Sequence, residues 1–363
     1  MVHDMVTVRD VRVVPFAIPL REPLATGFGS VALRRGFLVV LSDADGHEGI
    51  GEATPHPAAS PSALAEVGAE LERLAPRLVG ADVSRLLDAT THLGCVTRSA
   101  LDIAVYDLLG GVSGRPLADL LGGTRRAEVP VSALLAGGND EACILDACAA
   151  VERGFTTAKV KIGPDPEHAV RRVAAVRAAA APLRLRCDAN GAWDVRTAIA
   201  VGRELARLDI AWLEQPVPPA DLDGLRRVRR ESGVDVAADE AVTGPDVVPR
   251  LAGTVDAVVV KLVQVGGLTA ARATVQAAVR HGLRVTVTTG LETSIATAAA
   301  LHLAAALPEP LEPCGLATAS LLAHDLVDPA LVDAPTMTPP PGPGLGVRLS
   351  PGPPPRRAQP SPR

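Results

Sequence analysis

The feature that most constrains the fold is a repeat of short β-branched runs and longer helical runs that begins near Val129. The helical runs are rich in alanine and arginine and have the usual length of globular helices. Eight of the β-branched runs are predicted strands: Val129–Leu135, Thr156–Ile162, Leu183–Asp188, Ile210–Glu214, Val234–Asp239, Ala257–Leu262, Arg284–Thr288 and Leu311–Cys314. Strands that alternate with helices predict a parallel sheet, and eight units favour a closed (β/α)₈ barrel over an open sheet.

The segments around this repeat predict a second domain and a tail. The N-terminal part reads as an α+β capping domain, and the C-terminal end, rich in proline and arginine, cannot bury enough apolar surface to become ordered. The expected divisions are a capping domain at 1–125, the barrel at 126–320, a segment at 321–349 that packs back on the capping domain, and a disordered tail at 350–363. The expected capping elements are strands Val6–Ile18 and Gly36–Leu41 and helices Ser62–Leu78 and Ser99–Gly110.

Charge and hydropathy exclude two classes of partner. The formal net charge is −5 with acidic and basic residues interleaved, so no basic stripe is available for nucleic acid or an anionic membrane. The longest apolar run, Ile295–Leu307, is too short to span a bilayer, and the polar N-terminal residues do not suit a signal peptide. Five cysteines without a CxxC pair indicate reduced thiols, so we expect a cytoplasmic protein.

Lysine is rare in this chain. Among 36 basic residues the only lysines are Lys159, Lys161 and Lys261. Arginine cannot be deprotonated at useful pH, whereas a desolvated or crowded lysine can be. Codon bias could leave three lysines at random, but two of them form a Lys-x-Lys and all three lie in strand-like runs. The pattern favours a requirement for an amine at these positions.

Charged residues lie at the ends of five consecutive predicted strands. In chain order they are Lys161, Asp188, Glu214, Asp239 and Lys261. Their successive separations are 22 to 27 residues, about one βα unit each. Lys159 is two residues from Lys161 and therefore points to the same face of its strand. All these side chains are expected at the C-terminal rim, where (β/α)₈ barrels carry out their chemistry.

The three carboxylates predict a metal site. Isolated buried charge is too costly for all of them to stay ionised in a confined barrel mouth without a cation. One strand-end aspartate more often caps the next helix, but three on adjacent strands between lysines favour metal binding. An all-oxygen set favours Mg²⁺ over Mn²⁺ or Ca²⁺. We therefore predict Mg²⁺, with Mn²⁺ as the alternative, at Asp188, Glu214 and Asp239.

The lysines predict proton transfer at a carbon acid. Strands two and six lie opposite each other in an eight-stranded ring, so Lys161 and Lys261 would approach a central substrate from two faces. The like charges of Lys159 and Lys161 are expected to lower an ammonium pKa towards working pH, and the metal is expected to stabilise an enediolate. A Schiff-base aldolase would also use a strand lysine, but it would not need the acidic trio.

With these residues assembled, nearly the whole chain resembles the enolase superfamily and, within it, the muconate-lactonising-enzyme subgroup. The segments that carry the resemblance are Ala158–Lys161, Cys187–Gly191, Trp212–Pro216, Ala238–Glu240 and Lys261 with Gly266–Gly267. Ala241 stands where many relatives have serine, and this departure leaves the metal ligands intact. The resemblance implies a TIM-like barrel with an N-terminal α+β capping domain, lysine and Mg²⁺ catalysis, and a small-molecule carboxylate substrate.

Two segments bear on the reaction. Gly290–Ser294 and Cys314–Thr318 resemble o-succinylbenzoate synthases, which implies dehydration of 2-succinyl-6-hydroxy-2,4-cyclohexadiene-1-carboxylate in menaquinone biosynthesis. Dipeptide epimerases resemble one another in an Asp-x-Asp at the end of strand eight, where this chain has Cys314-Gly315-Leu316. N-succinylamino acid racemisation, muconate-type cycloisomerisation and dipeptide epimerisation remain alternatives on the same site. A non-catalytic barrel would be expected to have lost a lysine or a carboxylate.

The resemblance also implies where substrate is held. Segments 21–30 and 52–60 are expected to fold over the barrel mouth as lids, and glycines at 27 and 29 suit the first to movement. Substrate-binding or supporting residues are expected at Asn190, Glu240, Gly290, Glu292, Thr293 and His56. Relatives are commonly homo-oligomers, which leaves such an assembly open here.

Overall fold

Parallel strands form a barrel in the computed structural model, which describes residues 6–26, 29–57, 59–122, 126–308 and 310–351. Seven strands share one sheet in which neighbours in space are also neighbours in sequence. They are β5 (Ala133–Leu135), β6 (Thr157–Lys161), β7 (Arg184–Asp188), β8 (Trp212–Glu214), β9 (Val236–Ala238), β10 (Ala257–Lys261) and β11 (Arg284–Thr288). This order is the one that successive right-handed βα units produce.

Two residues close the ring between its edge strands. The N–H of Cys314 donates to the carbonyl of Pro130 at 2.7 Å, and the N–H of Gly315 donates to the carbonyl of Val287 at 2.9 Å. The predicted strand Leu311–Cys314 is therefore wrong in extent, because only bridges at Cys314 and Gly315 are formed. Pro310 directly precedes this segment and Pro313 lies within it, and both lack the amide hydrogen that a longer ladder needs.

The predicted first strand, Val129–Leu135, is also divided. Its start, β4 (Val129–Pro130), pairs antiparallel with β12 (Thr336–Met337), while only β5 joins the parallel sheet. Pro130 has no N–H to donate, which suits the point where the chain changes partner.

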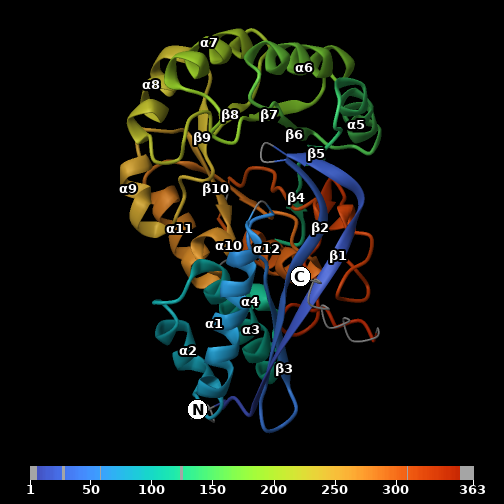
Figure 1. Ribbon diagram of the computed structural model, residues 1–363, viewed down its shortest axis with the longest axis vertical. Helices are drawn as coiled ribbons and strands as arrows, with labels where there is room; N and C mark the ends of the chain where they lie inside the picture. Colours follow the sequence, from blue (N-terminus) through green and yellow to red (C-terminus); the bar gives the residue numbers. More distant parts are fainter. Residues whose placement is uncertain (1–5, 27–28, 58, 123–125, 309, 352–363) are drawn as a thin grey trace, which may run out of the picture.

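Helices cover the outside of the barrel, and α5 to α8 form its outer layer in Figure 1. Aspartate, asparagine or threonine caps the start of several of them, for example Asp165 before α6 and Asp194 before α7. The helices are α5 (Asp140–Glu152), α6 (Pro166–Ala179), α7 (Val195–Ala206), α8 (Leu222–Ser232), α9 (Val248–Leu251) after the 3₁₀ turn η1 (Pro245–Val247), α10 (Leu262–Val265), α11 (Leu268–Arg280) and α12 (Ser294–Ala306).

The capping domain packs a three-stranded antiparallel sheet on a buried helix. Its elements are β1 (Asp10–Thr26), β2 (Gly29–Ser42), β3 (Glu48–Ala53), α1 (Pro61–Leu78), α2 (Val83–Ala89), α3 (Cys95–Ser113) and α4 (Leu117–Leu121). The sheet approaches α3 closely at Gly49 and Gly51, where an added Cβ would lie 2.1 and 2.0 Å from backbone oxygens of the helix. Glycine is therefore required at both positions. The long β1–β2 ribbon reaches from this sheet towards β5 in Figure 1.

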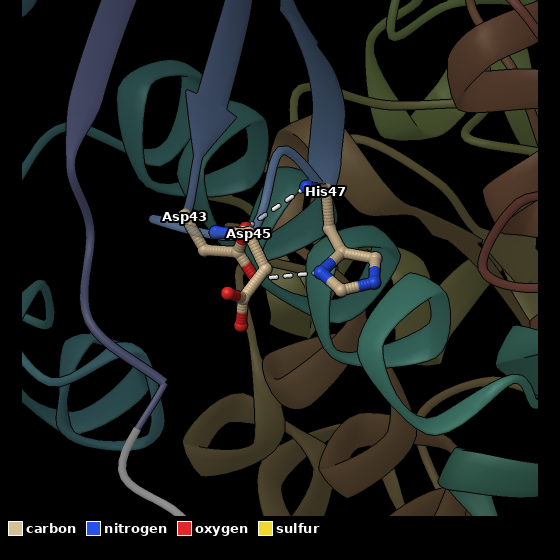
Figure 2. A group of neighbouring side chains, drawn as sticks. All are labelled: Asp43, Asp45 and His47. Atoms are coloured by element: carbon tan, nitrogen blue, oxygen red, sulfur yellow. Dashed lines mark hydrogen bonds and ion pairs between the residues drawn. The ribbon is translucent and has the colours of Figure 1, made fainter.

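The turn between β2 and β3 brings together Asp43, Asp45 and His47, three residues with potential metal-ligand atoms (Figure 2). Their arrangement is explained by the turn itself. Asp43 Oδ1 accepts hydrogen bonds from the backbone N–H groups of Asp45 and His47 at 2.9 and 2.8 Å, and Asp43 Oδ2 lies 2.7 Å from His47 Nδ1. An aspartate that binds the backbone two residues on is a common turn device.

The C-terminal segment, which includes the 3₁₀ turn η2 (Ala319–Leu321), contacts the capping domain. Asp107 of α3 accepts the N–H of Leu345 at 2.7 Å, and the N–H of Ala323 donates to the carbonyl of Pro19 at 2.8 Å. Ser350, the first residue of the expected tail, donates its N–H to the carbonyl of Leu326 at 2.9 Å. Residues 352–363 of the expected tail lie outside the described residues.

Within the part of the chain that the structure describes, none of the helices combines the length and apolar character that a bilayer crossing requires. The apolar run Ile295–Leu307 forms most of α12 and is almost entirely buried in the core. All five cysteines are free thiols.

A buried arginine lies inside the barrel, one side-chain layer below the strand ends. Arg186 of β7 is 3% exposed, its guanidinium is 2.9 Å from Glu312, and it stacks on the Trp212 ring at 4.0 Å from the centroid. Burial lowers the pKa of Arg186 to about 10, and the charge of Glu312 opposes that change. The pair therefore supplies charge compensation deep in the barrel.

Glu312→Gln is expected to lower the free energy of unfolding by about 3 kcal/mol, because it leaves the buried Arg186 guanidinium without its counterion. Equilibrium unfolding in urea measures the change. The matched control is Glu48→Gln, since Glu48 pairs with Arg12 at 2.5 Å while their side chains are 47% and 50% exposed. The control should lose less than about 1 kcal/mol, and equal losses in both variants would contradict the prediction.

Candidate active site

Three carboxylates meet at the C-terminal ends of neighbouring strands. Asp188 and Glu214 end β7 and β8 and are paired in register, and Asp239 directly follows β9. All three side chains are buried, and each offers an oxygen within 4.8 Å of the others. The fixed length of a βα unit explains why residues so far apart in sequence reach one point.

The three lysines contact these carboxylates directly. Lys159 Nζ lies 2.7 Å from Asp188 Oδ2 and 2.6 Å from Glu214 Oε1. Lys161 Nζ lies 2.5 Å from the same Asp188 oxygen, and Lys261 Nζ lies 2.7 and 2.6 Å from the two oxygens of Asp239. The structure thus brings together all six residues that the sequence singled out for metal binding and catalysis.

Burial and neighbouring charge act against each other in this cluster. Burial raises the pKa of Asp188, but Lys159 and Lys161 lower it more, so the pKa lies below its usual range. Burial, reinforced by Asp188 and Asp239 and opposed by Lys159, raises the pKa of Glu214 to about 7. The same balance acts on Asp239. Burial raises its pKa, but Lys261 lowers the pKa by more, so that it lies below its usual value.

The expected like-charge effect of the paired lysines does not hold at Lys159. Burial lowers the pKa of Lys159, but Asp188 and Glu214 outweigh burial and raise it well above its usual value. The contacts explain this result, because the ammonium lies between two carboxylates. Lys159 is therefore a fixed positive charge next to the carboxylates.

Asn190 and Glu240 form a hydrogen-bonded chain with Lys161. The carboxamide oxygen of Asn190 accepts from Lys161 Nζ at 2.9 Å, and its Nδ2 donates to Glu240 Oε1 at 3.0 Å. The backbone of Asn190 has φ 48°, a left-handed conformation that asparagine tolerates better than most residues. Both side chains line the central cavity.

That cavity has a volume of about 330 Å³ and lies between the barrel mouth and the capping domain. Its polar end is lined by Lys159, Lys161 and Lys261. Its apolar walls come from both domains: Leu24, Val96, Leu134, Val263 and Leu291. A cavity of this size with a few polar groups at one end is typical of small-molecule sites.

The residues expected to touch substrate separate into two groups. Gly290, Glu292 and His56 line the cavity, and His56 is exposed on the loop that follows β3. Thr293 does not line it but caps α12 and donates its N–H to Glu52 at 3.0 Å. The expected lid segment 21–30 lies in the β1–β2 hairpin, and its residue Leu24 lines the cavity. Residues 27 and 28 of this segment lie outside the described part of the chain.

Four buried or cavity-lining residues were missed by the sequence reasoning: Arg34, Glu52, Gln215 and Gln264. Gln215 accepts the N–H groups of Asp239 and Ala241 at 3.0 and 3.2 Å, which fixes the end of β9 against β8. A polar side chain directly after a strand-end ligand was a signal that could have found Gln215. Arg34 and Glu52 contact residues more than 200 positions away, and no local pattern reports such a contact.

The donor set suits a hard divalent cation. Asp188, Glu214 and Asp239 supply only carboxylate oxygens, they face one another at a buried point, and each has a cationic partner that a metal ion could replace. Mg²⁺ held by protein carboxylates usually keeps several positions for water and for substrate oxygens.

Two family models match the chain. Residues 144–352 match the family described as enolase C-terminal domain-like. Residues 8–122 match the mandelate racemase/muconate lactonizing enzyme N-terminal domain. The two matched regions correspond to the barrel side and the capping side of the structure.

Individual relatives divide among several reactions. An o-succinylbenzoate synthase from Thermobifida fusca is 42% identical over 214 residues, which cover 57% of this chain and 65% of that protein, just under two thirds of its length. A chloromuconate cycloisomerase from Delftia acidovorans is 32% identical over 350 residues, 92% of this chain and 94% of that protein. The solved dipeptide epimerase from Enterococcus faecalis, complexed with Mg and L-Leu-L-Tyr, has a TM-score of 0.88 at 28% identity, covering 94% of this chain and 99% of that one.

Proposed function

Because the chain belongs to the enolase superfamily, in the subgroup of the muconate-lactonising enzymes, we propose that it is a Mg²⁺-dependent enzyme that removes the proton next to a substrate carboxylate. Its relatives include a synthase and a cycloisomerase, which supports an enzyme of the lyase or isomerase classes. The single observation that carries the proposal is that Lys161 and Lys261, from β6 and β10, both line the cavity beside the buried carboxylates.

The acidic trio would hold the metal ion. When bound, Mg²⁺ supplies positive charge that stabilises the enediolate left when a carbon acid loses its proton. The solved epimerase from Enterococcus faecalis is itself a complex with Mg and a dipeptide, which supports a metal ion here. Lys159 lies between Asp188 and Glu214, so its ammonium adds fixed positive charge on the same side of the cavity.

We propose dehydration of 2-succinyl-6-hydroxy-2,4-cyclohexadiene-1-carboxylate to o-succinylbenzoate as the reaction. The identity to the Thermobifida fusca synthase supports it, although that match covers little more than half of this chain. The end of the eighth barrel segment also supports it. There the Gly315 carbonyl accepts the hydroxyls of Thr288 and Thr289 at 2.8 and 3.2 Å, and no carboxylate is present between 314 and 318 to hold a substrate ammonium group.

In this reaction Lys161 acts as both base and acid. Its Nζ, oriented by the Asn190 carboxamide, takes the proton from the carbon next to the carboxylate. The same group then returns a proton to the hydroxyl as the carbon–oxygen bond breaks, and water leaves. Lys261, held by both oxygens of Asp239, acts as a positive charge on the opposite side.

Racemisation of an N-succinylamino acid is the second candidate. The observation that favours it is that two amines, Lys161 and Lys261, reach the cavity from strands on opposite sides of the barrel. One amine would remove the proton from one face of the carbon, and the other would deliver a proton to the opposite face. An N-succinyl group carries no ammonium, so the lack of a carboxylate between 314 and 318 is compatible with this substrate too.

Lys261→Arg is expected to separate the two reactions. Arginine keeps the positive charge but cannot exchange a proton at useful pH. Dehydration should therefore continue at a reduced rate. The rate of racemisation should fall by more than about a hundredfold, which is the usual contribution of a positioned acid or base to the rate. Both reactions would be run on this variant in deuterium oxide, with incorporation into each substrate followed by mass spectrometry.

The wild-type enzyme provides the reference for that test. A panel with Mg²⁺ would compare the succinyl-cyclohexadiene substrate, N-succinylamino acids, muconates and dipeptides. Fast dehydration without racemisation would favour a dedicated synthase. If the wild type turns over muconates or dipeptides best, the dehydratase proposal is wrong, and an equal loss of both reactions in Lys261→Arg would refute the different roles of the two lysines.

A further inference from the structure

Arg34 is a buried arginine of β2 at the boundary between the capping domain and the barrel. Its side chain is only 3% exposed. The guanidinium donates through Nε to the carbonyl of Leu291 at 3.0 Å. It also donates through its two terminal nitrogens to the carbonyls of Pro55 and Thr54, at 2.5 and 3.2 Å. A buried guanidinium needs such partners, because leaving its donors unsatisfied costs several kcal/mol.

The three acceptors belong to the two loops that bound the cavity. The first loop, residues 54–57, follows β3 and brings His56 and Pro57 to the cavity. The second loop, residues 290–293, follows β11 and brings Gly290, Leu291 and Glu292 to it. One side chain of the capping domain therefore connects two cavity walls that are more than 200 residues apart in sequence.

The charge of Arg34 is balanced by a carboxylate of the second loop. A terminal nitrogen of Arg34 lies 3.8 Å from Glu292 Oε1, and the Glu292 side chain is 4% exposed. Glu52, which accepts the N–H of Thr293 at 3.0 Å, is also fully buried next to this loop. Without Arg34, the carboxylate of Glu292 would face the cavity uncompensated, where a substrate carboxylate would be repelled.

We propose that Arg34 is a positioning residue that fixes the spacing between loops 54–57 and 290–293 and thereby determines which carboxylate substrates the cavity accepts. The effect on substrate selection rests on the proposed function, whereas the connection between the two loops does not. Lysine cannot replace this arginine. Its ammonium is a compact point charge, whereas the planar guanidinium presents its donors in a rigid fork to three separate carbonyls.

The first experiment measures the loops directly, without any substrate. In Arg34→Lys, hydrogen–deuterium exchange of amides in 290–293 and in 54–57 should become at least about tenfold faster, which corresponds to a loss of about 1.4 kcal/mol of local stability. The N–H of Gly290, which donates to Glu292, and the N–H of Thr293 are reporters inside the second loop. Exchange in β7 and β8 should be unchanged.

Arg35→Lys is the matched control. Arg35 is the next residue of β2, it is exposed, and alternation along a strand places it on the other face. Equal exchange in the two variants would overturn the proposal. If Arg34→Lys does not fold, Pro55→Gly tests the same link from the other side, because it loosens the acceptor loop while the guanidinium stays. Faster exchange confined to 54–57 and 290–293 supports the proposal, and unchanged exchange overturns it.

The second experiment tests selectivity over carboxylates of different size. Relative to Arg35→Lys, the Arg34→Lys variant should raise KM for the preferred substrate by about tenfold, with kcat altered by less than about threefold, since uniform binding is lost and the lysine chemistry remains. The ranking of substrates should change. A fall in kcat with KM and ranking preserved would contradict a positioning role. Failure of the wild type on every carboxylate would refute the proposed function and leave the exchange result to decide on Arg34.

Discussion

Lys161→Arg is expected to lower turnover by more than about a hundredfold, because a guanidinium cannot serve as the general base. The variant keeps the charge, and the change in length is small. It also keeps a donor for Asp188 and Asn190, which hold the wild-type ammonium at 2.5 and 2.9 Å. Steady-state turnover and deuterium exchange at the α-carbon would both be measured, since exchange reports proton removal even when a later step is slow.

Two companion variants make this result specific. Lys159→Arg should retain more activity, because Lys159 acts as a fixed charge between Asp188 and Glu214. Lys161→Ala should recover activity when a small primary amine is added, because the missing group is then supplied from solution. If Lys161→Arg kept more than about a tenth of wild-type turnover, a loss below about 1.4 kcal/mol in activation free energy, the assignment of Lys161 as base would be wrong.

The barrel and its six central residues could be predicted because both depend on a regular repeat. Each βα unit has a nearly fixed length, so a charged residue at one strand end predicts where the next will lie. The register confirms this at β6, β7 and β8, where Lys161, Asp188 and Glu214 are consecutive partners across the sheet. The rarity of lysine then distinguished these strand-end lysines from the many surface arginines.

The ends of the repeat were predicted less well, because proline limits strand pairing there. The first strand was divided at Pro130, and the eighth was reduced to bridges at Cys314 and Gly315. Apolar periodicity reports which side chains are buried, but it does not report whether backbone N–H groups are available for a ladder. The barrel still closes, because the few bonds that remain join Pro130 and Ser132, just before β5, to β11 through these two residues.

The walls of the cavity could not be predicted, because they depend on contacts between the two domains. Arg34 reads as one of two adjacent arginines in a strand, and its burial becomes clear only when its contact with Leu291 is known. The charge balance at Lys159 has the same origin, since two carboxylates from other strands raise its pKa. The cavity walls depend on these long-range contacts, which explains why the sequence predicts the cluster of carboxylates and lysines more sharply than the reaction.

Glu214→Gln is expected to remove the stabilisation that Mg²⁺ gives to the folded protein. At a Mg²⁺ concentration about 100 times the Kd, the wild type should gain about 2.7 kcal/mol in free energy of unfolding. The variant should gain less than about a tenth of this amount and should lose its activity. Without metal it should be at least as stable as the wild type, because one of three carboxylates within 4.8 Å of one another has become neutral. Thermal unfolding with and without Mg²⁺, together with calorimetric titration, measures both effects.

Glu240→Gln is the matched control for this metal test. Glu240 directly follows Asp239 and lines the same cavity, but its carboxylate is outside the buried trio and accepts from Asn190 at 3.0 Å. Its loss should leave the Mg²⁺-dependent stabilisation intact, whatever it does to substrate binding. If Glu214→Gln gained as much stability from Mg²⁺ as the wild type, or if Glu240→Gln lost this gain instead, the ion would bind elsewhere. In that case the three strand-end carboxylates would be paired with the lysines alone, and the enediolate would lack the charge that this family's chemistry requires.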